Sequence, residues 1–346
     1  MIQAQPLEAS WLSAFVQVLD RCAIADTETV IVLCEQQSRP VLVQLAELAL
    51  GQLNRSFYRL VLPTPNHING PLVHSTGASL ALTGQAGAVD ALCRADVVID
   101  LTIEGLMHAS ETAQILRSGT RILNISNEHP ESLSRLVPQS SMKDIVRDSV
   151  RHLKDAQRMS VKSAAGTDLE VSMAGAQTVG VWGWTDKPGT LAHWPGGLVV
   201  SFPKANSVNG QLVLAAGDLN LTFKRYIESS VTLTLENDYV VKIEGQGADC
   251  ALMKNYLAAF NEKAAYATSH VGWGLNPAAR YEAMTFYDRE DTNGTELRAV
   301  AGNFLYSTGA NEFAGRFTRG HFDLPVMNCT ISLDDKVVVD AGVPVA

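Results

Sequence analysis

Eight histidines are spread over the 346 residues, and three of them lie in segments whose neighbours suit chemistry. His321 and Asp323 are two residues apart in the segment GHFDLP. On a β-strand, residues i and i+2 point to the same face, so this imidazole and this carboxylate would project together. One imidazole and one carboxylate on a rigid strand form half of a metal site. A hydrogen-bonded surface pair is the alternative for so short a motif.

Two further histidines are flanked by residues that bend the chain. His270, in SHVGWGLNP, ends an apolar segment and precedes two glycines that let the backbone approach a ligand closely. His193 lies in the Pro- and Gly-rich stretch TDKPGTLAHWPGGL, which could form a wall of a substrate site. A structural core histidine is the alternative at position 270. A long hairpin connection is the alternative at position 193.

Charge and cysteine content limit the class of protein. The formal net charge of −9 argues against nucleic acid and anionic membranes as partners, because both bind basic surfaces. Five widely spaced cysteines without a CxxC pair are typical of reduced thiols in the cytosol. The sequence has neither a recognisable signal peptide nor an apolar run of about 18 residues. We therefore expect a soluble, cytoplasmic protein.

The first part of the chain, residues 1–158, alternates β-branched runs with stretches of helical periodicity. The expected strands are 30–34, 58–62, 96–101 and 121–125. The expected helices are 41–53, 78–94, 106–117 and 142–158. This alternation predicts a Rossmann-like α/β domain with a mostly parallel sheet. No GxGxxG motif follows the first strand, so the sheet is expected to be a scaffold rather than a dinucleotide site.

The second part, residues 159–346, consists of short segments bounded by turn residues. The expected strands are 198–202, 212–215, 231–235, 240–244 and 337–340, with hairpin turns at 236–238 and 334–336. One helix is expected over 249–263. This pattern predicts an α+β domain with an antiparallel, barrel-like sheet. We expect the metal-binding catalytic site in this second domain.

Four motifs over residues 190–330, WPGGLVVSFP, SVNGQLVL, SHVGWGLNP and RGHFDLP, resemble the C-terminal domain of thermophilic-type leucine aminopeptidases, the aminopeptidase T family. The resemblance implies that fold, and those peptidases hold two metal ions. Leu198 and His270 stand where that family has glutamate ligands, and Leu305 stands where it has a histidine. Only His321 and Asp323 are unchanged. Too few ligands remain for two ions.

The chain more closely resembles the 2,5-dihydroxypyridine 5,6-dioxygenase family, over nearly its whole length, in TDKPGTLAHWPGG, ATSHVGWGLNP, FLYSTGAN and RGHFDLP. The resemblance implies one Fe(II) per chain at His270, His321 and Asp323, the two-histidine, one-carboxylate set of mononuclear non-haem oxygenases. It also implies extradiol-type cleavage of 2,5-dihydroxypyridine by O2 between C5 and C6. The product would be N-formylmaleamate, in nicotinate and picolinate degradation. Leu198 and Leu305, which stand in place of two aminopeptidase ligands, would make that side of the site apolar. An apolar surface suits an aromatic substrate.

Two polar residues of the C-terminal part are candidates for binding the substrate. Arg298 could hold the 2-oxo group through charge-assisted hydrogen bonds, or it could form a structural salt bridge with Glu296. Ser307, in YSTGAN, could donate a hydrogen bond to the substrate or to an oxygen species during catalysis. A turn hydroxyl is the alternative for Ser307.

Two histidines are candidates for proton transfer. His193 could act as an acid or a base next to the ring, with Trp194 beside it in the substrate site. His108 follows the strand that ends near residue 102, at the edge where α/β sheets bind ligands. We expect it to take part in catalysis as a lid or proton-transfer residue.

Three other interpretations stay open. The chain could be a metallo-aminopeptidase-like hydrolase, a dioxygenase for another hydroxylated aromatic ring, or a protein that binds a metal without catalysis. Leu198, in place of a glutamate ligand, argues against the hydrolase. The resemblance further implies a homo-oligomer whose partners are a small aromatic substrate and O2.

Overall fold

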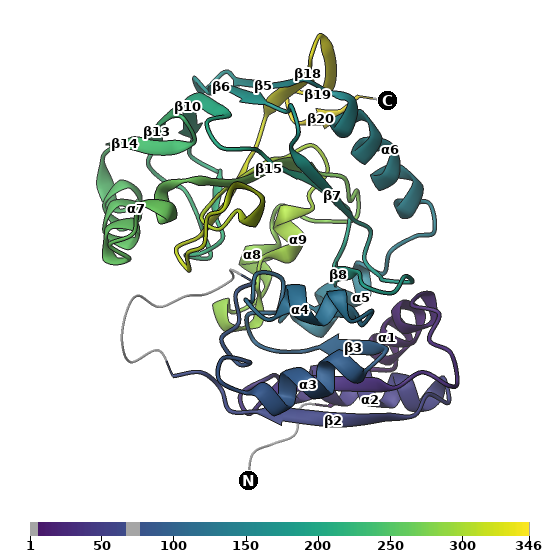
Figure 1. Ribbon diagram of the computed structural model, residues 1–346. Coiled ribbons are helices and arrows are strands. Elements are labelled where there is room, and N and C mark those ends of the chain that lie inside the picture. Colours follow the sequence, from purple (N-terminus) through teal and green to yellow (C-terminus); the bar gives the residue numbers. More distant parts are fainter. Residues whose placement is uncertain (1–5, 67–76, 346) are drawn as a thin grey trace.

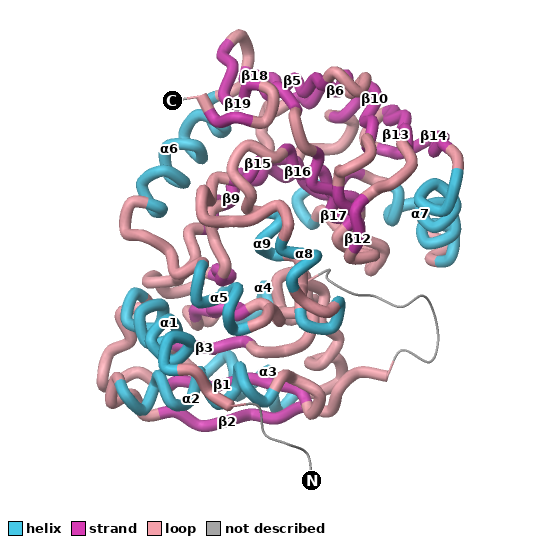
Figure 2. The backbone as a smooth tube through the Cα atoms, turned by 180° about the vertical axis from the view of Figure 1, so that it is seen from behind, coloured by secondary structure: helices cyan, strands magenta, loops and turns pink. Residues whose placement is uncertain are grey.

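The computed structural model describes residues 6–66 and 77–345, which form two regions (Figure 1). The N-terminal region contains a parallel sheet, and the C-terminal region contains two large antiparallel sheets and a small two-stranded one. Helices α8 (Ala283–Phe286) and α9 (Thr295–Arg298) lie between the regions when the molecule is viewed from either side (Figures 1 and 2). The predicted combination of an α/β part with an antiparallel α+β part is confirmed.

The parallel sheet has the strand order β2-β1-β3-β4-β8, and each neighbouring pair is parallel. Its strands are β1 (Val30–Glu35), β2 (Phe57–Leu62), β3 (Val97–Asp100), β4 (Arg121–Ile125) and β8 (Leu191–Trp194). All residues of β1, β3 and β4 are buried. Strands covered on both faces give the continuous apolar runs on which the prediction rested.

Helices cover both faces of the parallel sheet. Val30 and Val32 of β1 pack into the cluster that contains α1 and α2, whereas Ile31 and Leu33 pack into the cluster that contains α3 and α4. This division follows from the two-residue period of side chains along a strand. The helices are α1 (Ala9–Arg21), α2 (Pro40–Gln52), α3 (Ala86–Arg94), α4 (Thr112–Arg117) and α5 (Pro130–Arg135). Over the described parts of the chain, no helix is both long enough and apolar enough to span a membrane.

The first antiparallel sheet has the order β14-β13-β10-β6-β5-β18-β19-β20. Its strands are β5 (Arg158–Ser163), β6 (Asp168–Ser172), β10 (Val208–Leu214), β13 (Val231–Glu236), β14 (Tyr239–Gly245), β18 (Cys329–Leu333), β19 (Lys336–Asp340) and β20 (Val343–Pro344). The predicted hairpins are confirmed between β13 and β14 and between β18 and β19. Asn237, Asp238 and Asp334 adopt positive φ angles there, as tight turns require.

The second antiparallel sheet has the order β17-β16-β15-β9-β7 and shares one apolar core with the first. Its strands are β7 (Gln177–Val181), β9 (Leu198–Phe202), β15 (Thr268–Gly274), β16 (Phe304–Thr308) and β17 (Phe322–Val326). The remaining elements are β11 (Leu219–Asn220), β12 (Arg225–Tyr226), α6 (Met142–Asp155), α7 (Gly247–Ala259), and the 3-10 turns Lys263–Tyr266, Arg289–Asp291 and Glu312–Ala314. Helix α6 packs on β7 and β9.

Strand β8 differs from the sequence prediction, which gave a loop around His193. Residues 191–194 instead pair in parallel with β4 and complete the N-terminal sheet. The chain therefore returns to the first region after it has entered the second. The domain boundary between residues 158 and 159 stays a prediction. Strand β8 follows this boundary in the sequence but pairs with the N-terminal sheet.

All five predicted helices have somewhat different bounds, and three of them differ most. Helix α3 begins at Ala86 because Gly84 adopts a positive φ that interrupts the expected helix over 78–94. Helix α4 begins at Thr112 because the amide of Leu106 donates to the Asp100 carboxylate, and the following residues form a loop. Helix α7 ends at Ala259, before Asn261 turns into the left-handed region.

Candidate active site

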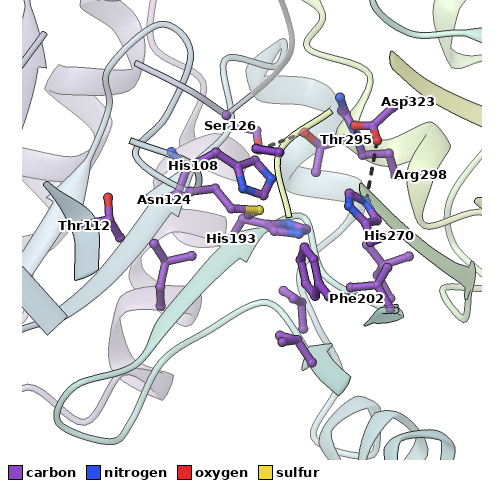
Figure 3. A pocket seen from close by; sticks show the side chains of 18 of the residues that line it. His108, Thr112, Asn124, Ser126, His193, Phe202, His270, Thr295, Arg298 and Asp323 are labelled. Atoms are coloured by element: carbon purple, nitrogen blue, oxygen red, sulfur yellow. Dashed lines mark hydrogen bonds and ion pairs between the residues drawn. The ribbon is translucent and has the colours of Figure 1, made fainter. Parts of the chain in front are cut away.

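A cavity of about 340 Å³ lies between the two regions (Figure 3). One wall is formed by the carboxyl ends of the parallel strands and the loops that follow them, with the side chains of Met107, His108, Asn124, Ser126 and His193. The opposite wall is one face of the second antiparallel sheet together with α9, with the side chains of Val200, Phe202, His270, Arg298, Leu305 and Asp323. Five of the predicted site residues therefore line one space, namely His108, His193, His270, Arg298 and Asp323.

The register of the second antiparallel sheet sets two neighbouring rows of residues on its cavity face. One row is largely apolar and runs across paired positions of four strands, Val179, Val200, Gly272 and Leu305. The next row lies one pleat further along and contains Phe202, His270, Ser307 and Asp323. Because side chains two residues apart share a face, the polar groups lie beside an apolar surface that suits an aromatic ring.

The Asp323 carboxylate is the common neighbour of the two histidines predicted to bind metal. Its Oδ1 atom lies 3.2 Å from Nε2 of His321 and 3.6 Å from Nε2 of His270. The two imidazole centroids are 6.0 Å apart. All three side chains are buried. The three predicted ligands, which are distant in sequence, thus converge on one point.

Two serine hydroxyls flank the ring nitrogens of His270. The Ser269 hydroxyl donates to the Ala310 carbonyl oxygen and lies 3.1 Å from Nδ1 of His270. Nε2 is the ring nitrogen that faces Ser307 and Asp323. Burial lowers the pKa of His270 to about 3, despite the opposing charge of Asp323, so the ring is neutral.

The Ser307 hydroxyl connects two of the predicted ligands. It donates a hydrogen bond to Oδ1 of Asp323 and lies 2.9 Å from Nε2 of His270. Within residues 6–66 and 77–345, no three His, Cys, Asp or Glu side chains are already arranged as a metal-binding group. The donor atoms converge, but in this arrangement they hydrogen-bond to the serine.

Arg298 holds the other oxygen of the carboxylate. Its Nε atom donates to Oδ2 of Asp323 over 2.5 Å, and both side chains are buried. Burial by itself would raise the pKa of Asp323, but the nearby Arg298 and His321 hold it well below its usual value. The alternative pairing of Arg298 with Glu296 is wrong, because Glu296 forms its salt bridge with Arg135, 2.9 Å away.

His193 and His108 lie in the cavity as neutral imidazoles. Nδ1 of His193 lies 2.6 Å from the Pro195 carbonyl oxygen, which can only accept, so Nδ1 carries the proton and Nε2 the lone pair. The His108 centroid lies 5.8 Å from that of His321 and 6.4 Å from that of His270. Burial lowers the pKa of both His193 and His108 to about 4.

Trp194 does not line the cavity, so its predicted role in substrate binding is wrong. Neighbouring residues on β8 point to opposite faces, and because His193 faces the cavity, Trp194 faces the N-terminal core. Its indole is fully buried and donates to the Leu136 carbonyl oxygen over 2.9 Å. The ring packs edge-on against Phe15.

Sequence analysis missed several cavity residues. Asn124 lies in β4 and Ser126 directly follows it. Polar residues at the carboxyl end of a buried parallel strand are a signal that could have identified both. Phe202, whose ring centroid is 5.2 Å from that of His270, could have been found from its spacing with Leu198 in WPGGLVVSFP. Asn293 and Thr295 carried no comparable signal.

Residues 10–346 match the family model described as 2,5-dihydroxypyridine 5,6-dioxygenase. The chain belongs to this family. A curated relative, the 2,5-dihydroxypyridine 5,6-dioxygenase of Pseudomonas putida KT2440, is 39% identical over 336 residues, which cover 96% of this chain and 95% of the relative. The family resemblance predicted from the motifs is confirmed, and the chain is an enzyme of a dioxygenase family.

Two solved structures resemble the fold. The 2,5-dihydroxypyridine dioxygenase of P. putida KT2440 has a TM-score of 0.93 and 38% identity, and the match covers 99% of both chains. AmpT from Thermus thermophilus has a TM-score of 0.64 and 14% identity, with 97% of this chain and 99% of that chain covered. The second likeness establishes only the fold, and it confirms the predicted aminopeptidase T-like architecture.

Proposed function

We propose that the enzyme uses O2 to open the ring of 2,5-dihydroxypyridine between C5 and C6, giving N-formylmaleamate, with one Fe(II) per chain. One observation carries the proposal in a chain of this family: a nitrogen from each of two imidazoles and an oxygen of one carboxylate converge beside an apolar surface. The apolar row accounts for an aromatic substrate. Leu198 and Leu305 of this surface also argue against a second metal ion.

The donors at His270, His321 and Asp323 fit Fe(II). Two ligands in neighbouring positions around one ion are about 3 Å apart when each is about 2.1 Å from the ion. The distances of 3.2 and 3.6 Å from Oδ1 of Asp323 to the two Nε2 atoms are close to this value. A bound Fe(II) would supply the electron exchange that allows O2 to react with an electron-rich ring.

Charge balance supports the binding of a singly deprotonated substrate. The donor set carries one negative charge, because the carboxylate is ionised and His270 is neutral. With Fe(II) the sum is about +1, and the formal charges of Arg298 and Glu104, which also line the cavity, cancel each other. A dihydroxypyridine anion would therefore bring the sum of these charges near zero. Neutrality matters here, because an uncompensated charge in a buried apolar cavity is unfavourable.

The other polar residues would bind the substrate and transfer its protons. Nε2 of His193 carries a lone pair and is suited to accept the proton of a substrate hydroxyl. His108 is also neutral and lies beside His270 and His321, where it would accept a proton from the substrate or return one to it. Arg298 and Ser307 fix Asp323, and the other N–H groups of Arg298 would also donate to substrate oxygens. Phe202 and the apolar row would exclude water around the ring.

We further propose a homo-oligomeric enzyme in a reducing, cytoplasmic environment. The five cysteines are all free, and four of them are buried, which fits such an environment. The oligomeric assembly rests on the resemblance alone. Sedimentation velocity of the purified enzyme tests it, and a monomer at micromolar concentration would contradict it.

The decisive experiment is anaerobic reconstitution with Fe(II), followed by oxygen-electrode measurements with 2,5-dihydroxypyridine, catechol and a leucine anilide. We expect O2 uptake with the dihydroxypyridine, one molecule per ring opened, and about one iron per chain. Uptake only with catechol would indicate a different ring substrate. Hydrolysis of the anilide, with two zinc or cobalt ions per chain, would support the aminopeptidase alternative.

A further inference from the structure

A buried carboxylate joins the two regions directly beside the cavity. Glu128 lies in the loop after β4 and is 1% exposed. Its Oε2 atom accepts hydrogen bonds from the hydroxyl of Thr292, 2.8 Å away, and from the amide of Asn293, 3.0 Å away. Its Oε1 atom accepts from the amide of Thr295 over 2.7 Å. One N-terminal side chain therefore fixes three groups of a C-terminal segment.

The segment that Glu128 holds ends in Arg298. Asn293 in turn contacts this arginine, because Nη1 of Arg298 lies 3.3 Å from both the carbonyl oxygen and Oδ1 of Asn293. Arg298 then donates to Oδ2 of Asp323. A continuous series of hydrogen bonds thus leads from Glu128 to the carboxylate whose other oxygen faces the two histidines.

Attachment of the two regions does not depend on Glu128 alone. Glu296, in the same segment, accepts two hydrogen bonds from Arg135, at 3.0 and 2.9 Å, and one from Ser132 at 2.7 Å. Glu296 therefore fastens α9 to α5 by itself. Glu128 acts on the turn before α9, where Asn293 and Thr295 line the cavity.

We propose that Glu128 is a positioning residue of the dioxygenase reaction, which orients Arg298 towards Asp323 and towards the substrate. This inference rests on the proposed function, because it assigns Arg298 a substrate oxygen to bind. Glu128 does not touch the substrate and acts through the segment 292–298. Glu128 thereby links the N-terminal wall of the cavity to the Asp323 carboxylate of the opposite wall.

The test compares Glu128→Gln with the wild type, both reconstituted with Fe(II) under anaerobic conditions. Glutamine keeps the side-chain volume but replaces one acceptor oxygen by an NH2 group. This group would face a backbone amide, so two donors would meet and one hydrogen bond would be lost. We expect the affinity for 2,5-dihydroxypyridine, measured by calorimetry without O2, to fall about tenfold. Glu131→Gln is the matched control, because it removes the same charge from an exposed position on α5, and it should leave the affinity unchanged.

A double-mutant cycle separates positioning from general structural damage. If Glu128 acts through Arg298, Glu128→Gln should have almost no further effect on affinity in the Arg298→Ala background. Equal losses in both backgrounds would overturn the proposal, as would an unchanged affinity of the single variant. If Glu128→Gln does not fold, Thr292→Val removes one hydrogen bond to Glu128 and takes its place in the same cycle.

Failure of the proposed function gives a different result. Wild-type enzyme that neither binds nor cleaves the dihydroxypyridine would refute the function itself. Wild-type enzyme that binds and cleaves it, with an additive cycle, would refute only the role of Glu128. Retention of iron after dialysis provides a second readout, and we expect Glu128→Gln to retain less iron than Glu131→Gln.

Discussion

The two walls of the cavity are built on different principles. The C-terminal wall presents His270, Ser307 and Asp323 from regular strands whose opposite face is core, so these groups are held rigidly. The N-terminal wall presents His108 and Ser126 from loops beyond the ends of parallel strands, and His193 from strand β8 itself. Rigid strands suit a ligand set with fixed distances, whereas a loop would allow His108 to adjust as it transfers a proton.

Acidic residues also serve the two walls differently. In the C-terminal wall, Asp323 lies in the site itself. In the N-terminal wall, Asp100 lies behind the site and accepts hydrogen bonds from Thr102, Leu106 and Asn124. These bonds shape the loop that carries His108. In the proposed function the first wall uses the buried Asp323 as a metal ligand, whereas the buried Asp100 of the second wall holds a loop.

Removal of any predicted ligand tests the rigid wall and should have the largest effect. We expect His270→Ala, His321→Ala and Asp323→Ala each to abolish iron retention and O2 uptake, because each removes one of three donors. Asp323→Ala should in addition lower the free energy of unfolding by about 3–5 kcal/mol, since Arg298 loses its buried carboxylate partner. Metal analysis and urea unfolding measure both effects. Near-wild-type turnover in any variant would exclude that residue as a ligand.

His193→Ala tests the proton-transferring wall. We expect kcat to fall about 10²-fold with little change in KM, because a general base is lost while the apolar surface remains. The adjacent Trp194→Phe variant is the control. Trp194 faces the core, so this change should reduce stability and leave kcat nearly unchanged. Equal kinetics of the His193 variant and the wild type would remove His193 from the reaction.

Neighbouring residues on β16 sharpen the contrast between cavity and core. Phe304 packs in the C-terminal core, whereas Leu305 lines the cavity. Phe304→Ala should lower the free energy of unfolding by about 3–5 kcal/mol, and Leu305→Ala by about 2 kcal/mol while raising KM. Steady-state kinetics and urea unfolding test this pair. A rise in KM for the Phe304 variant alone would contradict the assigned faces.

Glu35 lies in the N-terminal region outside the cavity lining, so we expect the smallest effect on activity and a change in stability alone. Burial raises its pKa from 4.5 to about 7, against the hydrogen bonds from Ile103 and Ser79. Between these values the unfolded chain releases the proton and the folded chain keeps it, so stability present at low pH is lost as pH rises. We expect a loss of up to about 3 kcal/mol between pH 4.5 and 7. Glu35→Gln should flatten this part of the stability profile, and an unchanged profile would refute the shift.

Several features could be predicted from local sequence. Strand β4 and strand β9 have the predicted bounds, because each is a β-branched run that ends at turn residues. His321 and Asp323 could be paired because their spacing matches the strand period. Strand β8 could not be predicted, because its pairing with β4 joins residues about 70 positions apart and overrides the Pro- and Gly-rich composition around it.

The sequence by itself determined the family and the alternation that puts His321 and Asp323 on one face of a strand. Only the tertiary structure decided that Arg298 pairs with Asp323 rather than Glu296, and that Trp194 turns into the core. It also decided that Glu128 contacts the segment before α9. The reason is physical: side-chain period is a local property of the backbone, whereas the partner of a buried charge depends on which distant segment the fold brings within about 3 Å.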